Sequence, residues 1–168
     1  MATRLTLVPI GQVEPAEIDA AAAAVREQLG LEVATVEPLD VPASARNPKR
    51  GQARAEVLLF LLKRVRPEDS LALGLTDIDL YATGLNFVFG LASQRTGVAV
   101  VSVARLRDPE RAGPTQKRVA TEAVHEVGHL LGLAHCLADG CAMRFSNTLA
   151  EADRKGPDLC PRCSRAVS

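Results

Sequence analysis

The stretch VHEVGHLLGLAHC, residues 124–136, contains all three histidines of the 168-residue chain. His125 and His129 are four residues apart, so on a helix their imidazoles project from one face, one turn apart. Histidine is the commonest metal ligand among side chains, and one ion can accept a nitrogen from each ring. The stretch therefore predicts a metal-binding helix, which we expect over about residues 114–131.

Gly132 and His135 complete the pattern HExxHxxGxxH. Glycine lets the chain leave the helix sharply after His129, because it adopts a left-handed conformation without a Cβ clash. His135 can then approach the same ion from another side. Three neutral imidazoles leave one coordination position open for water, which is the ligand count of a catalytic zinc site.

Glu126 follows the first histidine and is rotated by roughly 100° around the helix. We expect it to touch a water bound to the ion, not the ion itself. This arrangement suits hydrolysis of a peptide bond. Zinc would lower the pKa of the water, and Glu126 would accept its proton and later protonate the leaving amine. A bare HExxH does arise by accident, but the longer pattern with Gly132 and His135 argues against coincidence.

All four cysteines lie downstream, with four residues between Cys136 and Cys141 and two between Cys160 and Cys163. In a reducing compartment these spacings favour a closed structural zinc site with four thiolates. Two disulfides are the alternative and would suit an exported protein, and a redox CxxC is a third possibility. The N-terminus shows no signal peptide, so the thiolate site is preferred.

The upstream sequence alternates strand-like and helical runs, which predicts an α+β fold around a mixed, twisted sheet. Pro15 suits the first turn of a helix and Gly30 suits its end. The short connection QRT, residues 94–96, suits an antiparallel strand pair. The expected strands cover residues 4–10, 31–37, 69–76, 85–93 and 97–106, and the expected helices residues 14–30 and 52–65.

Composition narrows the class of protein. A hydrophobic content of 47% over 168 residues suits about one globular domain. Twenty basic and twenty acidic residues cancel, which argues against nucleic acid or an anionic membrane surface as a partner. No apolar run approaches the roughly 18 residues of a membrane span, and we expect a soluble, cytoplasmic protein.

The segment HEVGHLLGLAHC, followed by CAM and CPRC, resembles the archaemetzincins, a branch of the metzincin clan of zinc-dependent metallopeptidases. Residues 73–90, LGLTDIDLYATGLNFVFG, resemble the same family, so the likeness covers roughly residues 70–163. It implies a single metzincin-like catalytic domain over residues 1–168. Residues 1–132 would form an N-terminal subdomain with the sheet and active-site helix, and residues 133–168 a small C-terminal subdomain stabilised by zinc.

The resemblance also implies that Met143 forms an apolar floor beneath the three imidazoles, although an ordinary core methionine is the alternative. It nominates residues 85–92 as the edge strand that holds an extended peptide. Phe145 stands where some metzincins have a tyrosine that reaches the metal or the oxyanion, so the oxyanion partner stays unidentified. Tyr81 either lines the cleft or simply packs, and packing is preferred.

We therefore predict a zinc metallopeptidase with two zinc ions, one catalytic and one structural, and a peptide or protein as substrate. The alternative is a zinc-stabilised binding or regulatory module with a protease-like site and little turnover. The intact Glu126 favours the enzyme. The basic loop at residues 45–54 could attract an acidic substrate terminus or a phosphate, but we interpret it as a solvated surface loop.

Overall fold

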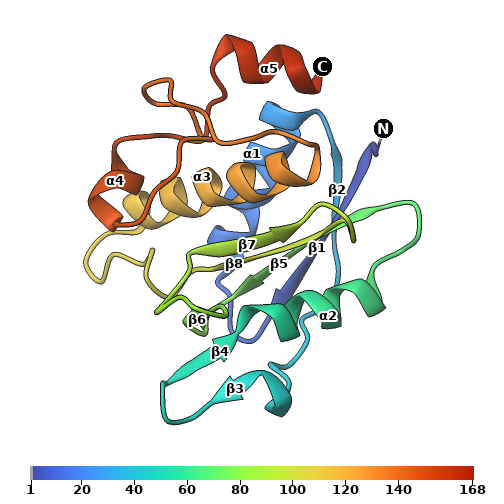
Figure 1. The fold of residues 1–168 in the computed structure, drawn as a ribbon, viewed down its shortest axis with the longest axis vertical. Helices are drawn as coiled ribbons and strands as arrows, with labels where there is room; N and C mark the ends of the chain where they lie inside the picture. The colour runs from blue at the N-terminus through green and yellow to red at the C-terminus, as the bar shows by residue number, and fades with distance from the viewer. Residues whose placement is uncertain (1) are drawn as a thin grey trace.

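A five-stranded sheet forms the centre of the computed structural model, which describes residues 2–168 (Figure 1). The strand order is β2-β1-β5-β8-β7, and the first four of these strands are parallel. β7 pairs antiparallel with β8 and forms one edge of the sheet, with β2 at the other, so the predicted mixed sheet is confirmed. The bounds are β1 (Arg4–Ile10), β2 (Glu32–Thr35), β5 (Leu71–Thr76), β7 (Gly90–Ser93) and β8 (Val98–Ser102).

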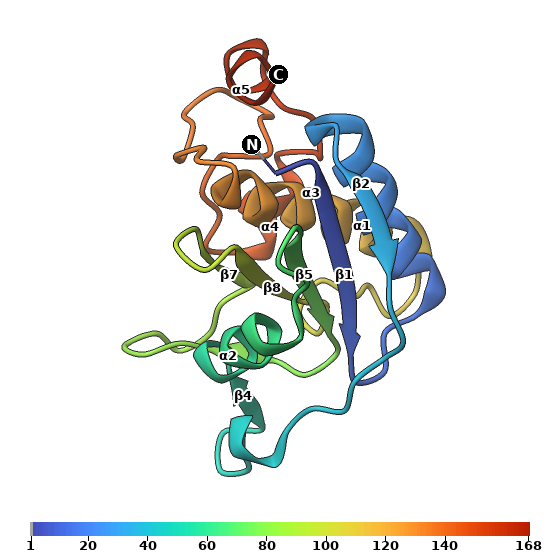
Figure 2. The ribbon, with the colours of Figure 1, turned by 90° about the vertical axis from the view of Figure 1, so that its right-hand side faces the viewer.

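Helices cover both faces of this sheet, as Figure 2 shows. α1 (Pro15–Leu29) and α3 (Ala112–Leu130) pack on one face, and α2 (Ala55–Val65) packs on the other. Successive side chains of a strand point to opposite faces, so Leu5 and Leu7 of β1 join the cluster under α1 and α3 while Val8 joins the one under α2. Strands covered on both faces are apolar at nearly every position, as the central strands β5 and β8 are.

The predicted first helix is confirmed at both ends. Pro15 occupies its first turn, Glu14 and Glu17 form a capping box, and Gly30 ends it with a φ of 67°. The second predicted helix starts later than expected, because Gln52–Arg54 form the strand β4 instead. β4 lies between β3 (Arg46–Asn47) and β6 (Leu80–Tyr81) in a small second sheet.

The predicted strand over residues 85–93 is wrong in its first half, since only Gly90–Ser93 form β7. The backbone carbonyl of Asn86 is already occupied: it accepts hydrogen bonds from the side chains of Arg50 and Gln52, each at 3.0 Å. The Arg50 guanidinium also stacks on the Tyr81 ring, 4.0 Å from its centroid. Arg50 of the basic loop therefore makes its polar contacts within the protein, although it is exposed, and Tyr81 packs in the small sheet.

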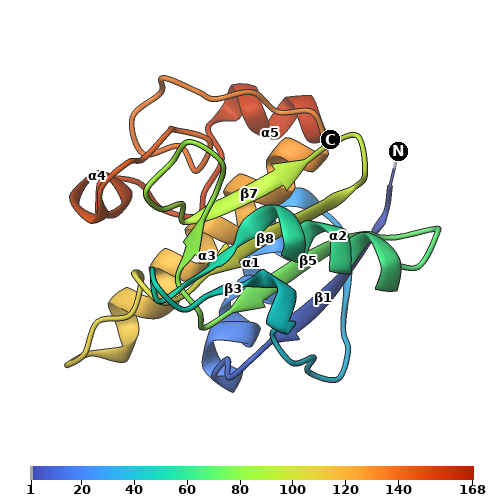
Figure 3. The same ribbon diagram turned by 60° about the horizontal axis from the view of Figure 1, so that its bottom comes forward.

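The C-terminal segment lies over the α3 side of the molecule, as Figure 3 shows, and carries the short helices α4 (Leu149–Asp153) and α5 (Pro161–Val167). α3 itself begins two residues before the predicted start and ends one residue before the predicted end. Gly132 follows it with a φ of 93°, the left-handed conformation expected there. Across residues 2–168, no helix is both long enough and apolar enough to cross a membrane.

Candidate metal centres

α3 holds the first two histidines inside the fold. Its apolar face packs against α1 and the sheet, and His125 is only 5% exposed. The Nε2 atoms of His125 and His129 lie 3.2 Å apart. Two nitrogens bound to one tetrahedral zinc at about 2.1 Å would be separated by roughly 3.4 Å. The pair therefore fits a single zinc ion placed between the two rings.

Backbone carbonyls orient both rings. Nδ1 of His125 lies 2.7 Å from the carbonyl oxygen of Ala142, and Nδ1 of His129 lies 2.8 Å from that of Leu133. A carbonyl can only accept, so each Nδ1 donates a proton and each Nε2 keeps its lone pair for a metal. Burial, with the charge of Lys155 adding to it, lowers the pKa of His125 to about 3. The ring is therefore neutral and able to bind a metal at neutral pH.

His135 completes the histidine cluster from the solvent side. The chain turns back after Gly132, and the Leu133 amide donates to the Gly128 carbonyl at 3.0 Å. One ring nitrogen from each of the three histidines then lies within 4.8 Å of the others. The structure thus brings together the three ligands expected from the sequence, with His135 as the exposed member.

Met143 is fully buried and packs against the backbone of α3. A Cβ atom at Gly128, which lies between the two helical histidines in sequence, would come within 2.5 Å of the Met143 sulfur. The glycine therefore lets the sulfur approach the helix in the turn that carries the metal ligands. Phe145 follows with its ring centroid 5.3 Å from that of His135.

Glu126 is buried beside the edge strand β7. A Cβ atom at Gly90 would lie 2.7 Å from its Oε1 atom, so the glycine makes room for the carboxylate. Burial first, and then the charge of Glu122, raises the pKa of Glu126 to about 8 in the metal-free protein. Gly90 was not singled out from the sequence, although a glycine inside a predicted strand often marks a close approach.

A cavity of about 480 Å³ opens in front of the histidines. Leu85 and residues 87–92 line one side, and Leu133 and Phe145 line the other. Tyr81 is not among the lining residues; its hydroxyl accepts a hydrogen bond from Asn47 at 3.3 Å. The segment nominated for substrate therefore does face the site, whereas Tyr81 packs elsewhere.

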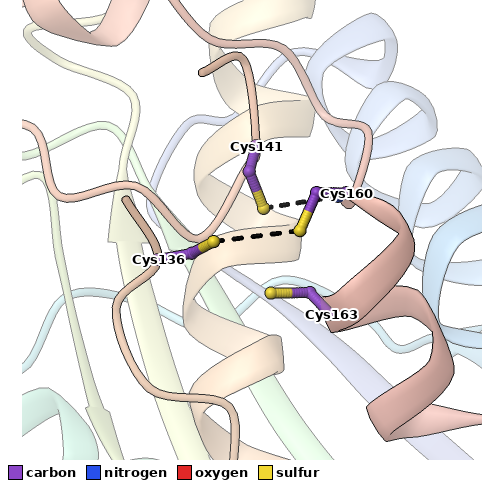
Figure 4. A group of neighbouring side chains, drawn as sticks. All are labelled: Cys136, Cys141, Cys160 and Cys163. Atoms are coloured by element: carbon purple, nitrogen blue, oxygen red, sulfur yellow. Dashed lines mark hydrogen bonds between the residues drawn. The ribbon is translucent and has the colours of Figure 1, made fainter. Parts of the chain in front are cut away.

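The four cysteine sulfurs converge on one point between the loop after α3 and the start of α5, as Figure 4 shows. All four lie within 4.8 Å of one another, and the sulfurs of Cys136 and Cys160 are 3.8 Å apart. A disulfide would need about 2.05 Å, whereas two sulfurs on one tetrahedral zinc at about 2.3 Å are separated by roughly 3.8 Å. The cluster fits a closed thiolate zinc site, and none of the four cysteines forms a disulfide.

Glu122 and Lys155 are two charged residues near the histidines that the sequence did not single out. Each is only 3% exposed, and Lys155 Nζ lies 3.5 Å from Glu122 Oε1. Glu122 precedes His125 by three residues, so a carboxylate on the same helix face was visible in the sequence. Lys155 stands among exposed charges in the sequence, and no local pattern marks it as buried.

Known proteins share this fold and a substantial part of this sequence. The sequence profile of Peptidase family M54 matches residues 24–168. An archaemetzincin from Methanocaldococcus jannaschii is 37% identical over 173 residues, covering 99% of this chain and 94% of that protein. The crystal structure of an archaemetzincin from Methanopyrus kandleri has a TM-score of 0.86 at 40% identity, covering 98% of this chain and 94% of that one.

A zinc-dependent peptidase from Methanocorpusculum labreanum has a similar structure, with a TM-score of 0.85 at 28% identity, covering 98% of this chain and 100% of that one. The resemblance noted in the sequence is confirmed by a matching profile that spans most of the chain. The chain therefore belongs to peptidase family M54, the archaemetzincins, and is a zinc metallopeptidase.

Proposed function

We propose that the histidine cluster is the catalytic centre, with His125, His129 and His135 as the ligands of a zinc ion and Glu126 as the general base. The observation that carries this proposal is the buried Glu126 carboxylate, which faces the same cavity as the three imidazoles. Zinc bound there would supply a Lewis acid for the carbonyl of the scissile peptide bond and for a water molecule. Glu126 would take a proton from the attacking water and pass it to the leaving amine.

We further propose that β7 holds the substrate backbone. β7 is the edge strand on the side of the cavity, and its Gly90, Leu91 and Ala92 line the cavity beside Glu126. An extended peptide that pairs with this edge gains affinity from backbone hydrogen bonds. Phe145, which also lines the cavity, has no hydroxyl to offer an oxyanion, so a partner for that charge would have to come from another group.

The proposal includes a second, structural zinc held by Cys136, Cys141, Cys160 and Cys163. This ion would stabilise residues 133–168 as a small C-terminal subdomain on the subdomain formed by residues 1–132. The sulfur spacing of 3.8 Å between Cys136 and Cys160 supports the assignment.

Elemental analysis of the purified protein is expected to give two zinc ions per chain, since three imidazoles and four cysteine sulfurs gather in two separate groups. His129→Ala should reduce the ratio to one, because two remaining imidazoles bind zinc weakly. A ratio of one in the unchanged protein, persisting after zinc supplementation, would remove one of the two assignments.

Zinc binding at the histidines is expected to release about one proton at pH 7. In the metal-free protein Glu126 has a pKa raised to about 8 and is therefore mostly protonated, while His125 is already neutral. A cation beside the carboxylate favours its charged form, so the proton leaves as zinc binds. The zinc affinity should rise by about tenfold per pH unit below pH 8 and level off above it.

Calorimetric titration in buffers of different ionisation enthalpy measures this proton release. Glu126→Gln has no carboxyl proton to lose and serves as the control. Equal proton release by the two proteins would show that the carboxyl of Glu126 is not coupled to the metal.

A further inference from the structure

Lys155 donates hydrogen bonds to backbone carbonyls on both sides of Met143. Its side chain is 1% exposed, and Nζ lies 2.7 Å from the carbonyl oxygen of Arg144 and 3.3 Å from that of Ala142. These two carbonyls belong to the residues directly before and after Met143. One buried ammonium group therefore fixes the backbone on either side of the methionine that packs on α3.

The same ammonium group reaches α3 itself through Glu122. Glu122 Oε1 lies 3.5 Å from Lys155 Nζ and has no hydrogen-bond partner within residues 2–168. A buried carboxylate needs a compensating charge, and Lys155 supplies it. Glu122 lies one helical turn before Glu126, so the contact joins the Met143 turn to the part of α3 that carries the site.

The carbonyl of Ala142 links Lys155 to the histidine metal centre. Its carbonyl oxygen accepts from Nδ1 of His125 at 2.7 Å and from Lys155 Nζ at 3.3 Å. The two nitrogens lie 3.5 Å apart, but both are donors, so they do not bond to each other and instead share the carbonyl. The acceptor that orients the first histidine is thus held in place by Lys155.

We propose that Lys155, with Glu122 as its counter-ion, is a positioning residue for the histidine metal centre. It keeps the Ala142 carbonyl at the distance that holds the His125 ring in its metal-binding orientation. Buried ion pairs are weak contributors to stability compared with apolar residues of the same size, so a positional role explains this pair better than a stabilising one. The inference rests on the metal centre proposed above.

The double variant Lys155→Met/Glu122→Gln tests the inference, because it removes both charges together and leaves neither one buried alone. We expect it to fold and to bind zinc at the histidines about 10- to 100-fold more weakly, the usual effect of losing a group that orients a metal ligand. In the metal-free variant, nitrogen NMR of the imidazoles should show His125 no longer fixed as the Nδ1–H tautomer.

Arg118→Met/Asp153→Asn is the matched control. It removes a more exposed ion pair, 2.7 Å long, that also joins α3 to the α4 region but does not touch residues 142–144. The control should keep both the zinc affinity and the His125 tautomer.

Unchanged zinc affinity and an unchanged His125 tautomer in the double variant would overturn the inference. If that variant does not fold, Lys155→Arg provides the test: it keeps the charge, but a planar guanidinium cannot place its donors as an ammonium does, so weaker zinc binding is expected and equal binding contradicts the inference. Absence of zinc at the histidines in the unchanged protein would overturn the proposed function instead, while the tautomer, measured without metal, still decides the role of Lys155.

Discussion

Glu126→Gln is expected to keep zinc at the histidines and to lower peptide hydrolysis by a factor of roughly 10² or more. The substitution keeps the size and shape of the side chain but removes the group that accepts the proton. Because Glu126 is buried and its carboxylate fits against Gly90, a glutamine of the same shape can occupy the space without moving β7. Turnover of a peptide library, together with zinc content, measures both parts of the prediction.

His129→Ala is the contrasting variant, since it should lose the zinc of the histidine site together with the activity. Equal residual activity in Glu126→Gln and the unchanged protein would show that the carboxylate does no proton transfer. That outcome would favour the binding or regulatory module with little turnover.

Cys160→Ser should lose the thiolate zinc and, with it, much of the activity, although Cys160 does not line the catalytic cavity. His135 and Cys136 are neighbours in the chain but belong to different clusters. The Cys136 amide donates to the Met143 carbonyl at 3.0 Å, and the Ala142 amide donates to the Asp158 carbonyl at 2.9 Å. Loosening the cysteine cluster therefore displaces both the third histidine and the Ala142 carbonyl.

Displacements of about 1 Å near a reacting centre can cost roughly 10²-fold in rate, which is the loss expected for Cys160→Ser. Ser164→Ala, in the same helix α5, is the matched control and should retain both ions and full turnover. Zinc content and peptide turnover distinguish the two variants. If Cys160→Ser bound zinc at the histidines as tightly as the unchanged protein, the two centres would be independent.

Local signals predicted the parts of this molecule that are determined by neighbours in the chain. The HExxHxxGxxH spacing predicted which side chains of α3 share a face, and Gly30 and Gly132 marked helix ends because both need positive φ values. Nearly continuous apolar runs located β1, β5 and β8, since each of these strands is buried on both faces.

Contacts between segments far apart in the chain determine the features that the sequence did not predict. Residues 85–89 have strand-like composition, but side chains of Arg50 and Gln52, more than thirty positions earlier, occupy the carbonyl of Asn86. β3 and β4 are two and three residues long, too short for any periodicity to appear. Lys155 meets Glu122 and Ala142 only because the C-terminal segment folds back over α3.

The position of β7 at an edge of the sheet also bears on self-association of the protein. An unpaired strand offers its amides and carbonyls to any extended chain, including another copy, and long flat edges promote aggregation. β7 has only four residues, so it spans about 13 Å, and turns follow it directly. A short edge limits self-association, and by the same measure it limits the proposed grip on substrate to a stretch of about four peptide units.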